Sequence, residues 1–204
     1  MKEIFLAVDI QNDFIEKDGA LYVEGAEKLK VTWKAINQYA YENNYQQMYT
    51  GDCHTIEDEE ISSDPDYKTT FPLHCLIGNK GAEFILEVEP VYPQTYHWIS
   101  PGIKTPVPSD IRDIVFYKNK FDVFAGNPYI DKVLKVLKPD RFYVYGVATN
   151  VCVDFAVRGL IKRGYKVVVI QDGIKELPGA DLDKLYQEWR ELGATMINFL
   201  GGRI

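Results

Sequence analysis

The chain has 204 residues, of which 46% are hydrophobic, 13% aromatic and 26% charged. This composition predicts one globular domain over residues 1–204 and argues against disorder, because enough apolar surface is present to fill a core. The net charge of −7, without a cluster of Lys and Arg, argues against a nucleic-acid partner.

Cysteine content and hydropathy predict a soluble cytoplasmic protein. Three cysteines cannot all pair in disulfides, which suits a reducing compartment. The first apolar run is interrupted by Asp9 and lacks a secretory signal pattern. No stretch of about 18 apolar residues occurs, so we expect no membrane contact.

Strand and helix patterns alternate along the first half of the chain. Residues 4–8 form a continuous apolar run, which is typical of a strand buried on both faces. Residues 25–44 carry apolar side chains at helical spacing, and 45–50 form a second strand candidate. A polar loop over 51–78 precedes a short predicted helix over 81–88.

The alternation continues in the second half. Five prolines within 89–110 preclude a long helix there, although a short strand over 95–99 is compatible with them. We predict strands over 111–117, 141–147, 166–170 and 194–199, and helices over 127–137, 150–163 and 181–192.

This order of elements predicts an α/β fold, a three-layer α/β/α sandwich around a mostly parallel, Rossmann-like sheet. Ligands of such sheets bind beyond the carboxyl ends of the strands. The candidate site residues are therefore the polar ones that follow strands: Asp9, Asp52, His54, Lys118 and the 148–152 turn.

Cys152 follows the strand and turn YVYGVATNVC and stands near the start of a predicted helix. The partial positive charge and free N–H groups of a helix N-terminus lower a thiol pKa and favour the nucleophilic thiolate. The same N–H groups can hold a developing oxyanion. The alternative is that Cys152 is simply a small buried hydrophobe.

Asp9 and Lys118 each stand at the end of a predicted strand. Alone, Asp9 would be a turn residue and Lys118 a solvated charge. At corresponding strand ends both can converge on Cys152, where an ammonium favours the thiolate and a carboxylate shuttles its proton. Lys120 is an alternative to Lys118. A Cys–His arrangement is disfavoured because all three histidines precede Cys152.

Asp52, His54 and His74 could hold a metal ion. Asp52 and His54 are two residues apart and would share a face of an extended segment, and His74 lies at the other end of the same loop. One carboxylate and two imidazoles suit Zn, Fe or Mn. The alternative for each histidine is a hydrogen-bonded loop residue.

Neighbouring polar residues have plainer interpretations. Asp64 and Asp66 could each add an oxygen ligand, although acidic loop residues are usually solvated. Cys53 and Cys75 flank the proposed ligands, and we interpret both as packing residues. We interpret His97, between Tyr96 and Trp98, as structural.

Four segments together resemble the isochorismatase-like cysteine hydrolases, and within them the nicotinamidases. Their order along the chain and their places at strand ends make the resemblance specific. The segments are VDIQNDF (8–14), GDCH (51–54) followed by FPLHCLIGNKGAEF (71–84), YKNKFDVFAG (117–126) and GVATNVCV (146–153).

The resemblance implies the isochorismatase-like hydrolase fold and a catalytic triad of Asp9, Lys118 and Cys152. It favours Lys118 over Lys120 because the lysine of the family precedes an aromatic residue by three positions, here Phe121. The implied reaction converts nicotinamide to nicotinate and ammonia through a cysteine thioester, as a step of NAD salvage and pyridine nucleotide biosynthesis. The implied partners are a small amide substrate and further copies of the chain.

The resemblance also assigns the surroundings of the triad. It implies a cis peptide between Val147 and Ala148, with the N–H groups of Ala148 and Cys152 facing the oxyanion. It implies a divalent metal, zinc first, with Fe or Mn as alternatives. The implied metal ligands are Asp52, His54 and His74 with Asp66 as an optional fourth, and the implied aromatic pocket residues are Phe14, Phe71 and Phe121.

Several positions depart from the family pattern. Phe71 and Cys53 stand where tryptophan is usual, and Asp122-Val123-Phe124 replaces Ser-Ala-Phe after the lysine. A related hydrolase of another small amide or ureido compound is therefore an alternative. A non-catalytic metal- or ligand-binding module is a second. An isochorismate hydrolase would have no use for the metal-binding segment. A flavodoxin-like nucleotide binder would need a Gly-rich phosphate loop after the first strand, where this chain has QNDFIEKDG instead.

Overall fold

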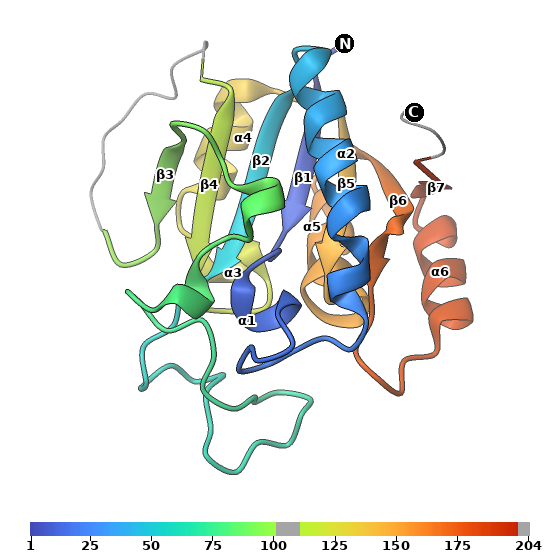
Figure 1. Ribbon diagram of the computed structural model, residues 1–204. Coiled ribbons are helices and arrows are strands. Elements are labelled where there is room, and N and C mark those ends of the chain that lie inside the picture. Colours follow the sequence, from blue (N-terminus) through green and yellow to red (C-terminus); the bar gives the residue numbers. More distant parts are fainter. Residues whose placement is uncertain (101–110, 200–204) are drawn as a thin grey trace.

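A single seven-stranded sheet organises the computed structural model, which describes residues 1–100 and 111–199. The strand order is β3-β4-β2-β1-β5-β6-β7 (Figure 1), and every neighbouring pair among these strands is parallel. The strands are β1 (Glu3–Val8), β2 (Gln46–Asp52), β3 (Gln94–His97), β4 (Asp113–Lys118), β5 (Arg141–Val147), β6 (Lys166–Lys175) and β7 (Thr195–Ile197).

Helices cover both faces of this sheet (Figure 1). One face packs against α2 (Lys30–Glu42), whose Trp33 and Ile36 are fully buried. The other face packs against α4 (Ile130–Leu137), α5 (Asp154–Lys162) and α6 (Leu182–Glu191). The predicted three-layer α/β/α architecture is confirmed.

The central strand β1 shows why the predicted sheet is buried on both sides. Ile4, Leu6 and Val8 belong to the core beneath α4 and α5. Phe5 and Ala7 alternate with them and belong to the core beneath α2. A continuous apolar run therefore supplies two cores at once, since successive side chains of a strand point to opposite faces.

The register of the sheet brings the strand ends to one edge. Val8 pairs with Thr50 on one side and with Gly146 on the other, and Asp52 pairs with Lys118. Gly146 has φ +128°, and a Cβ atom there would lie 2.0 Å from the Val8 carbonyl oxygen. Only glycine fits this approach of β5 to β1.

The predicted helix over 81–88 is wrong. Two short 3₁₀ turns, Lys80–Ala82 and Leu86–Val88, stand there instead, separated by extended backbone. The Asn12 N–H donates to the Glu83 carbonyl over 2.9 Å, so the segment pairs with the chain after β1 rather than with itself.

The predicted helix over 150–163 is present but starts differently. A π-helical turn, Thr149–Val153, precedes α5 and contains Cys152. The Ala148 carbonyl accepts from the N–H groups of both Val151 (3.0 Å) and Val153 (3.1 Å), which widens this turn. Cys152 consequently lies inside a turn ahead of α5 rather than at the first residue of an α-helix.

Other boundaries shift by a few residues. The predicted helix over 25–44 is divided into a 3₁₀ turn, Ala26–Leu29, and α2, and β6 runs on to Lys175. Two four-residue helices, α1 (Asn12–Ile15) and α3 (Val123–Gly126), were not predicted. Pro101, Pro106 and Pro108 of the proline-containing stretch lie outside the described residues. Within the described ranges no helix is long and apolar enough to cross a membrane.

Candidate active site

Asp9 is the first polar residue after β1 and is fully buried. Its φ of +51° places it in the left-handed region, which is uncommon for a residue other than glycine. The Thr50 hydroxyl donates to Asp9 Oδ1 over 2.7 Å. This hydrogen bond and the unusual backbone fix the carboxylate at the carboxyl edge of the sheet.

Lys118 ends β4 and brings the charged residues together. Its ammonium lies 2.9 Å from Asp9 Oδ2 and also donates to Asp52 Oδ1. It donates to Cys152 Sγ over 3.6 Å as well. The sulfur, an Asp9 oxygen and an Asp52 oxygen all lie within 4.8 Å of one another. The structure therefore brings together the three predicted catalytic residues in one buried cluster.

Lys120 lies elsewhere. Its side chain is 41% exposed and forms an ion pair of 3.0 Å with Glu59. Because β4 ends at Lys118, residue 120 is already in the turn that follows the strand. Of the two lysines, only Lys118 contacts Cys152 in this geometry.

The expected lowering of the Cys152 pKa is wrong for this geometry. Burial raises the pKa of the thiol well above its usual value, and the carboxylates of Asp9 and Asp52 add to the rise. Lys118 opposes them without prevailing. The thiol is therefore protonated at rest. Burial also raises the pKa of Asp9, against the opposing effect of Lys118.

Lys118 and Asp52 carry charges that the cluster itself stabilises. Burial alone would lower the pKa of Lys118, but Asp52 and Asp9 outweigh it and raise the pKa well above the usual value. Burial alone would raise the pKa of Asp52, but Lys118 and the two neighbouring histidines hold it below its usual range. A buried charge persists only when it is paired in this way.

Asp52, His54 and His74 form a second cluster beside the first. Their ligand atoms lie within 4.8 Å of one another, and all three side chains are buried. His54 Nε2 is 3.9 Å from Asp52 Oδ1, and His74 Nε2 is 3.8 Å from Asp52 Oδ2. These separations are too long for hydrogen bonds.

The chemistry of this cluster fits a divalent metal ion. His54 Nε2 is buried and has no hydrogen-bond partner among the described residues, an arrangement that costs free energy unless something occupies the space before it. Two imidazole nitrogens and a carboxylate are the donor set of many zinc sites, and they leave further coordination positions open. Burial lowers the pKa of His54, which favours the neutral, ligating form.

Asp66 is not brought to this cluster. Its carboxylate Oδ1 accepts hydrogen bonds from the backbone N–H groups of Lys68, Thr69 and Thr70, at 2.8–2.9 Å, and thereby organises its own exposed turn. Asp64 is exposed as well. The expectation of Asp66 as an optional fourth ligand is therefore wrong for this geometry, because local turn hydrogen bonds hold the side chain at the surface.

Aromatic side chains surround the sulfur. Phe14, Phe71 and Phe121 line a pocket with Cys152 and Ala148, and the rings of Phe71 and Phe121 meet edge to face at 5.4 Å. The free volume is about 20 Å³, close to that of one water molecule. The peptide bond between Val147 and Ala148 is cis, as the resemblance implies.

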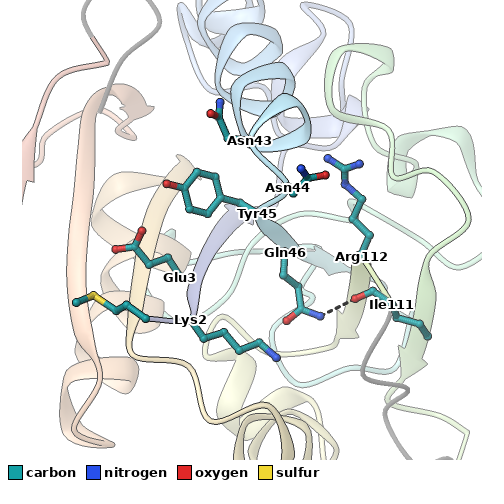
Figure 2. A pocket seen from close by; sticks show the side chains of 9 residues that line it. Lys2, Glu3, Asn43, Asn44, Tyr45, Gln46, Ile111 and Arg112 are labelled. Atoms are coloured by element: carbon teal, nitrogen blue, oxygen red, sulfur yellow. Dashed lines mark hydrogen bonds between the residues drawn. The ribbon is translucent and has the colours of Figure 1, made fainter.

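A larger, open pocket lies at the opposite end of the sheet, where β1 and β2 begin (Figure 2). Its residues include Lys2, Glu3 and Arg112, and the Gln46 side chain donates there to the Ile111 carbonyl over 2.7 Å. Its lining includes neither cysteine nor histidine. This pocket is larger than the one beside Cys152, but Asp9, Lys118 and Cys152 lie at the other edge of the sheet.

Two supporting residues were missed by sequence reasoning. Gln11 is fully buried, donates to the Asp52 carbonyl and accepts from the Asp52 N–H, each over 2.7 Å. Asp13 accepts from the Cys75 N–H over 2.6 Å, next to His74. The signal was the run of polar residues directly after a buried strand, where a plain loop was expected.

The two remaining cysteines and His97 lie outside the cluster of Asp9, Lys118 and Cys152. Cys53 and Cys75 are buried, and burial raises the pKa of the Cys53 thiol to about 11. Cys53 Sγ lies 3.2 Å from His97 Nε2, and the His97 ring packs on that of Tyr117. These contacts agree with packing roles for all three residues.

Comparison with known proteins agrees with the class that this fold and cluster define. The family model of the isochorismatase domain matches residues 101–199. A nicotinamidase/pyrazinamidase of Mycobacterium tuberculosis is 28% identical over 82% of this chain and 83% of its own length.

Solved structures share the fold at lower identity. A pyrazinamidase of Pyrococcus horikoshii in complex with zinc aligns with a TM-score of 0.75, at 22% identity, over 98% of this chain and 100% of the other. An N-carbamoylsarcosine amidase of Thermoplasma acidophilum aligns with a TM-score of 0.74, at 21% identity, over 97% and 96%. These similarities confirm the resemblance to the isochorismatase-like hydrolases and indicate a hydrolase that acts on amide bonds.

Proposed function

We propose that the protein hydrolyses nicotinamide to nicotinate and ammonia, with Cys152 as nucleophile, Asp9 as proton shuttle and Lys118 as the stabilising cation. The observation that carries this proposal is the buried contact of the Lys118 ammonium with both Asp9 and Cys152. The similarity to the nicotinamidase/pyrazinamidase of Mycobacterium tuberculosis supports this choice of substrate.

Acylation starts from a protonated thiol. Asp9 takes the proton as the Cys152 sulfur attacks the amide carbon, so the thiolate is formed only when the substrate is in place. Lys118 stabilises the negative charge that develops on the sulfur. The C–N bond then breaks, Asp9 returns the proton to the departing ammonia, and a thioester to Cys152 remains.

Deacylation uses the same groups. Asp9 takes a proton from a water molecule that attacks the thioester carbon, the C–S bond breaks, and the proton returns to the sulfur. The products are the carboxylic acid and the free thiol, so one water is consumed and one ammonia released per cycle. In both halves the N–H groups of Ala148 and Cys152 would hold the oxyanion, and Ala148 lines the pocket beside the sulfur.

Asp52, His54 and His74 would hold a divalent ion, for which we propose zinc. When bound, such an ion supplies a Lewis acid that can fix a nitrogen of the substrate ring. Asp52 links this cluster to the catalytic one, because its Oδ1 also accepts from Lys118. Asp52 would therefore contact both the ion and the lysine that lies beside the sulfur.

The pocket supports a small aromatic substrate. Its walls are largely apolar, from Phe14, Phe71, Phe121 and the aliphatic Leu21 and Leu177, and this favours burial of a flat ring. The fold is shared with an N-carbamoylsarcosine amidase, so a small ureido compound is the second candidate. We further propose that the enzyme acts in the cytoplasm, in NAD salvage, as a homo-oligomer.

An ammonia-release assay on nicotinamide, pyrazinamide and N-carbamoylsarcosine tests the proposal. We expect the two aromatic amides to be hydrolysed and the ureido compound to be spared. Treatment with a chelator should weaken aromatic turnover, and added Zn²⁺ should restore it. Hydrolysis of N-carbamoylsarcosine alone, unaffected by the chelator, would contradict both the substrate and the metal.

A further inference from the structure

A short acidic segment, Asp58–Glu59–Glu60, connects the histidine cluster to the chain that follows Lys118. Asn119 donates its side-chain amide to Asp58 Oδ1 over 3.2 Å. Lys120 pairs with Glu59 at 3.0 Å, and the Phe121 N–H donates to Glu60 over 2.8 Å. Three successive acidic residues thus contact three successive residues of the segment that carries the catalytic lysine.

Asp58 contacts His54 directly. Its Oδ2 lies 3.3 Å from His54 Nδ1 and accepts the Thr55 N–H over 2.8 Å. The Asp58 side chain is 9% exposed, although most acidic side chains of such loops are solvated. The His54 backbone is already fixed, because its N–H donates to the Cys75 carbonyl over 2.9 Å. What remains free is the rotation of the imidazole ring and the placement of its proton.

The contact between Asp58 and His54 Nδ1 determines which nitrogen of His54 keeps a lone pair. A carboxylate only accepts hydrogen bonds, so a neutral His54 must donate from Nδ1 and leave Nε2 unprotonated. His74 shows the same logic, since its Nδ1 lies 2.7 Å from the Pro72 carbonyl, which also only accepts. In their neutral forms, both imidazoles therefore carry the lone pair on Nε2, the nitrogen that lies nearer Asp52.

We propose that Asp58 is the positioning residue of the metal site, holding the His54 ring and its tautomer for ligation and tying them, through Asn119, to the segment after Lys118. This inference rests on the proposed metal site but not on the identity of the substrate. A carboxylate behind a ligating histidine typically changes metal affinity by about 10- to 100-fold when it is removed.

The first test measures Zn²⁺ affinity by competition with a chromogenic chelator, without substrate. Asp58→Ala should bind Zn²⁺ about 10- to 100-fold more weakly than the wild type. Asp58→Asn should fall between them, because its amide oxygen still accepts from Nδ1. Glu57→Ala removes an exposed charge from the same loop and should bind as the wild type does. Equal affinity of Asp58→Ala and wild type, or an equal loss in Glu57→Ala, would overturn the proposal.

The second test needs no variant and no metal. Nitrogen chemical shifts of the ¹⁵N-labelled, metal-free protein should show His54 protonated at Nδ1 and bare at Nε2, and Asp58→Asn should weaken that preference. A wild-type His54 protonated at Nε2 would overturn the proposal even if nicotinamide is hydrolysed. Conversely, if nicotinamide is not hydrolysed while the chemical shifts and Zn²⁺ affinities are as expected, that result would reject the proposed substrate and leave the role of Asp58 standing.

Discussion

Lys118 Nζ lies 2.9 Å from Asp9 Oδ2, and both side chains are buried at the carboxyl edge of the sheet. The two residues come from β4 and from the end of β1, with β2 between them. The same ammonium reaches Cys152 and Asp52. One cation therefore balances the charges of two buried carboxylates and contacts the sulfur that the proposed mechanism ionises.

Replacement of that cation should abolish turnover. In Lys118→Met we expect ammonia release to fall by at least about 10²-fold, because the thiolate loses its counter-charge. Unfolding in urea should show a loss of about 3–5 kcal/mol, since two buried carboxylates are left unpaired. Lys120→Met is the matched control and should change both quantities little. If both variants lose activity and stability to the same extent, the effect does not depend on the buried contacts of Lys118.

Asp9→Asn should separate thiol reactivity from turnover. The Asp9 carboxylate raises the pKa of the Cys152 thiol, so its removal should lower that pKa. Alkylation of Cys152 by iodoacetamide near pH 8, followed by mass spectrometry of the peptide, should become faster. Ammonia release should nevertheless fall, because the proton shuttle is gone. A variant that alkylates more slowly than the wild type would contradict this account of the cluster.

Glu60 should make stability depend on pH. Burial raises its pKa to about 7, with Asp52 adding and Lys118 opposing. The unfolded chain releases this proton near its ordinary pKa of 4.5, so between about pH 4.5 and 7 the folded state holds more protons and stability falls as pH rises. The free energy of unfolding of the wild type, measured in urea, should therefore be lower at pH 8 than at pH 5 when each value is compared with that of Glu60→Gln.

The Glu60→Gln variant keeps an acceptor for the Phe121 N–H but cannot ionise. Its stability relative to the wild type should therefore improve from pH 5 to pH 8. Glu57→Gln, at an exposed position of the same loop, should show no such trend. A constant difference between wild type and Glu60→Gln across this pH range would show that the carboxyl does not titrate there.

Gly146→Ala should disrupt the edge of the sheet that carries the site. A Cβ atom there would lie 2.0 Å from the Val8 carbonyl oxygen, directly before Asp9. We expect a loss of about 3 kcal/mol or more in thermal or urea unfolding. Gly164 has a similar positive φ of +85°, with no atom of the described residues within 4 Å of an added Cβ, and Gly164→Ala should cost only about 1–2 kcal/mol. Equal losses would mean that backbone conformation, not the contact, governs the site.

The sequence could predict where the site lies because strand ends are readable. Asp9, Asp52 and Lys118 each follow or end an apolar run, and parallel pairing brings such ends to one edge. The α/β/α layers followed from the same alternation.

The rest depended on three-dimensional burial. The direction of the Cys152 pKa could not be predicted, because it is a balance between burial, two carboxylates and one ammonium. The 81–88 segment looked helical until its pairing with the chain after β1 was known. Asp58 and Asp66 are similar acidic loop residues in the sequence, and only their hydrogen bonds distinguish the partly buried one from the exposed one.

The most direct test of the account compares Cys152→Ala with Cys75→Ala in ammonia release from nicotinamide. Both variants remove a buried thiol, but only Cys152 contacts Lys118. We expect Cys152→Ala to lose activity by several orders of magnitude and Cys75→Ala to keep most of it. Near-normal ammonia release by Cys152→Ala would contradict the central claim that this sulfur is the nucleophile.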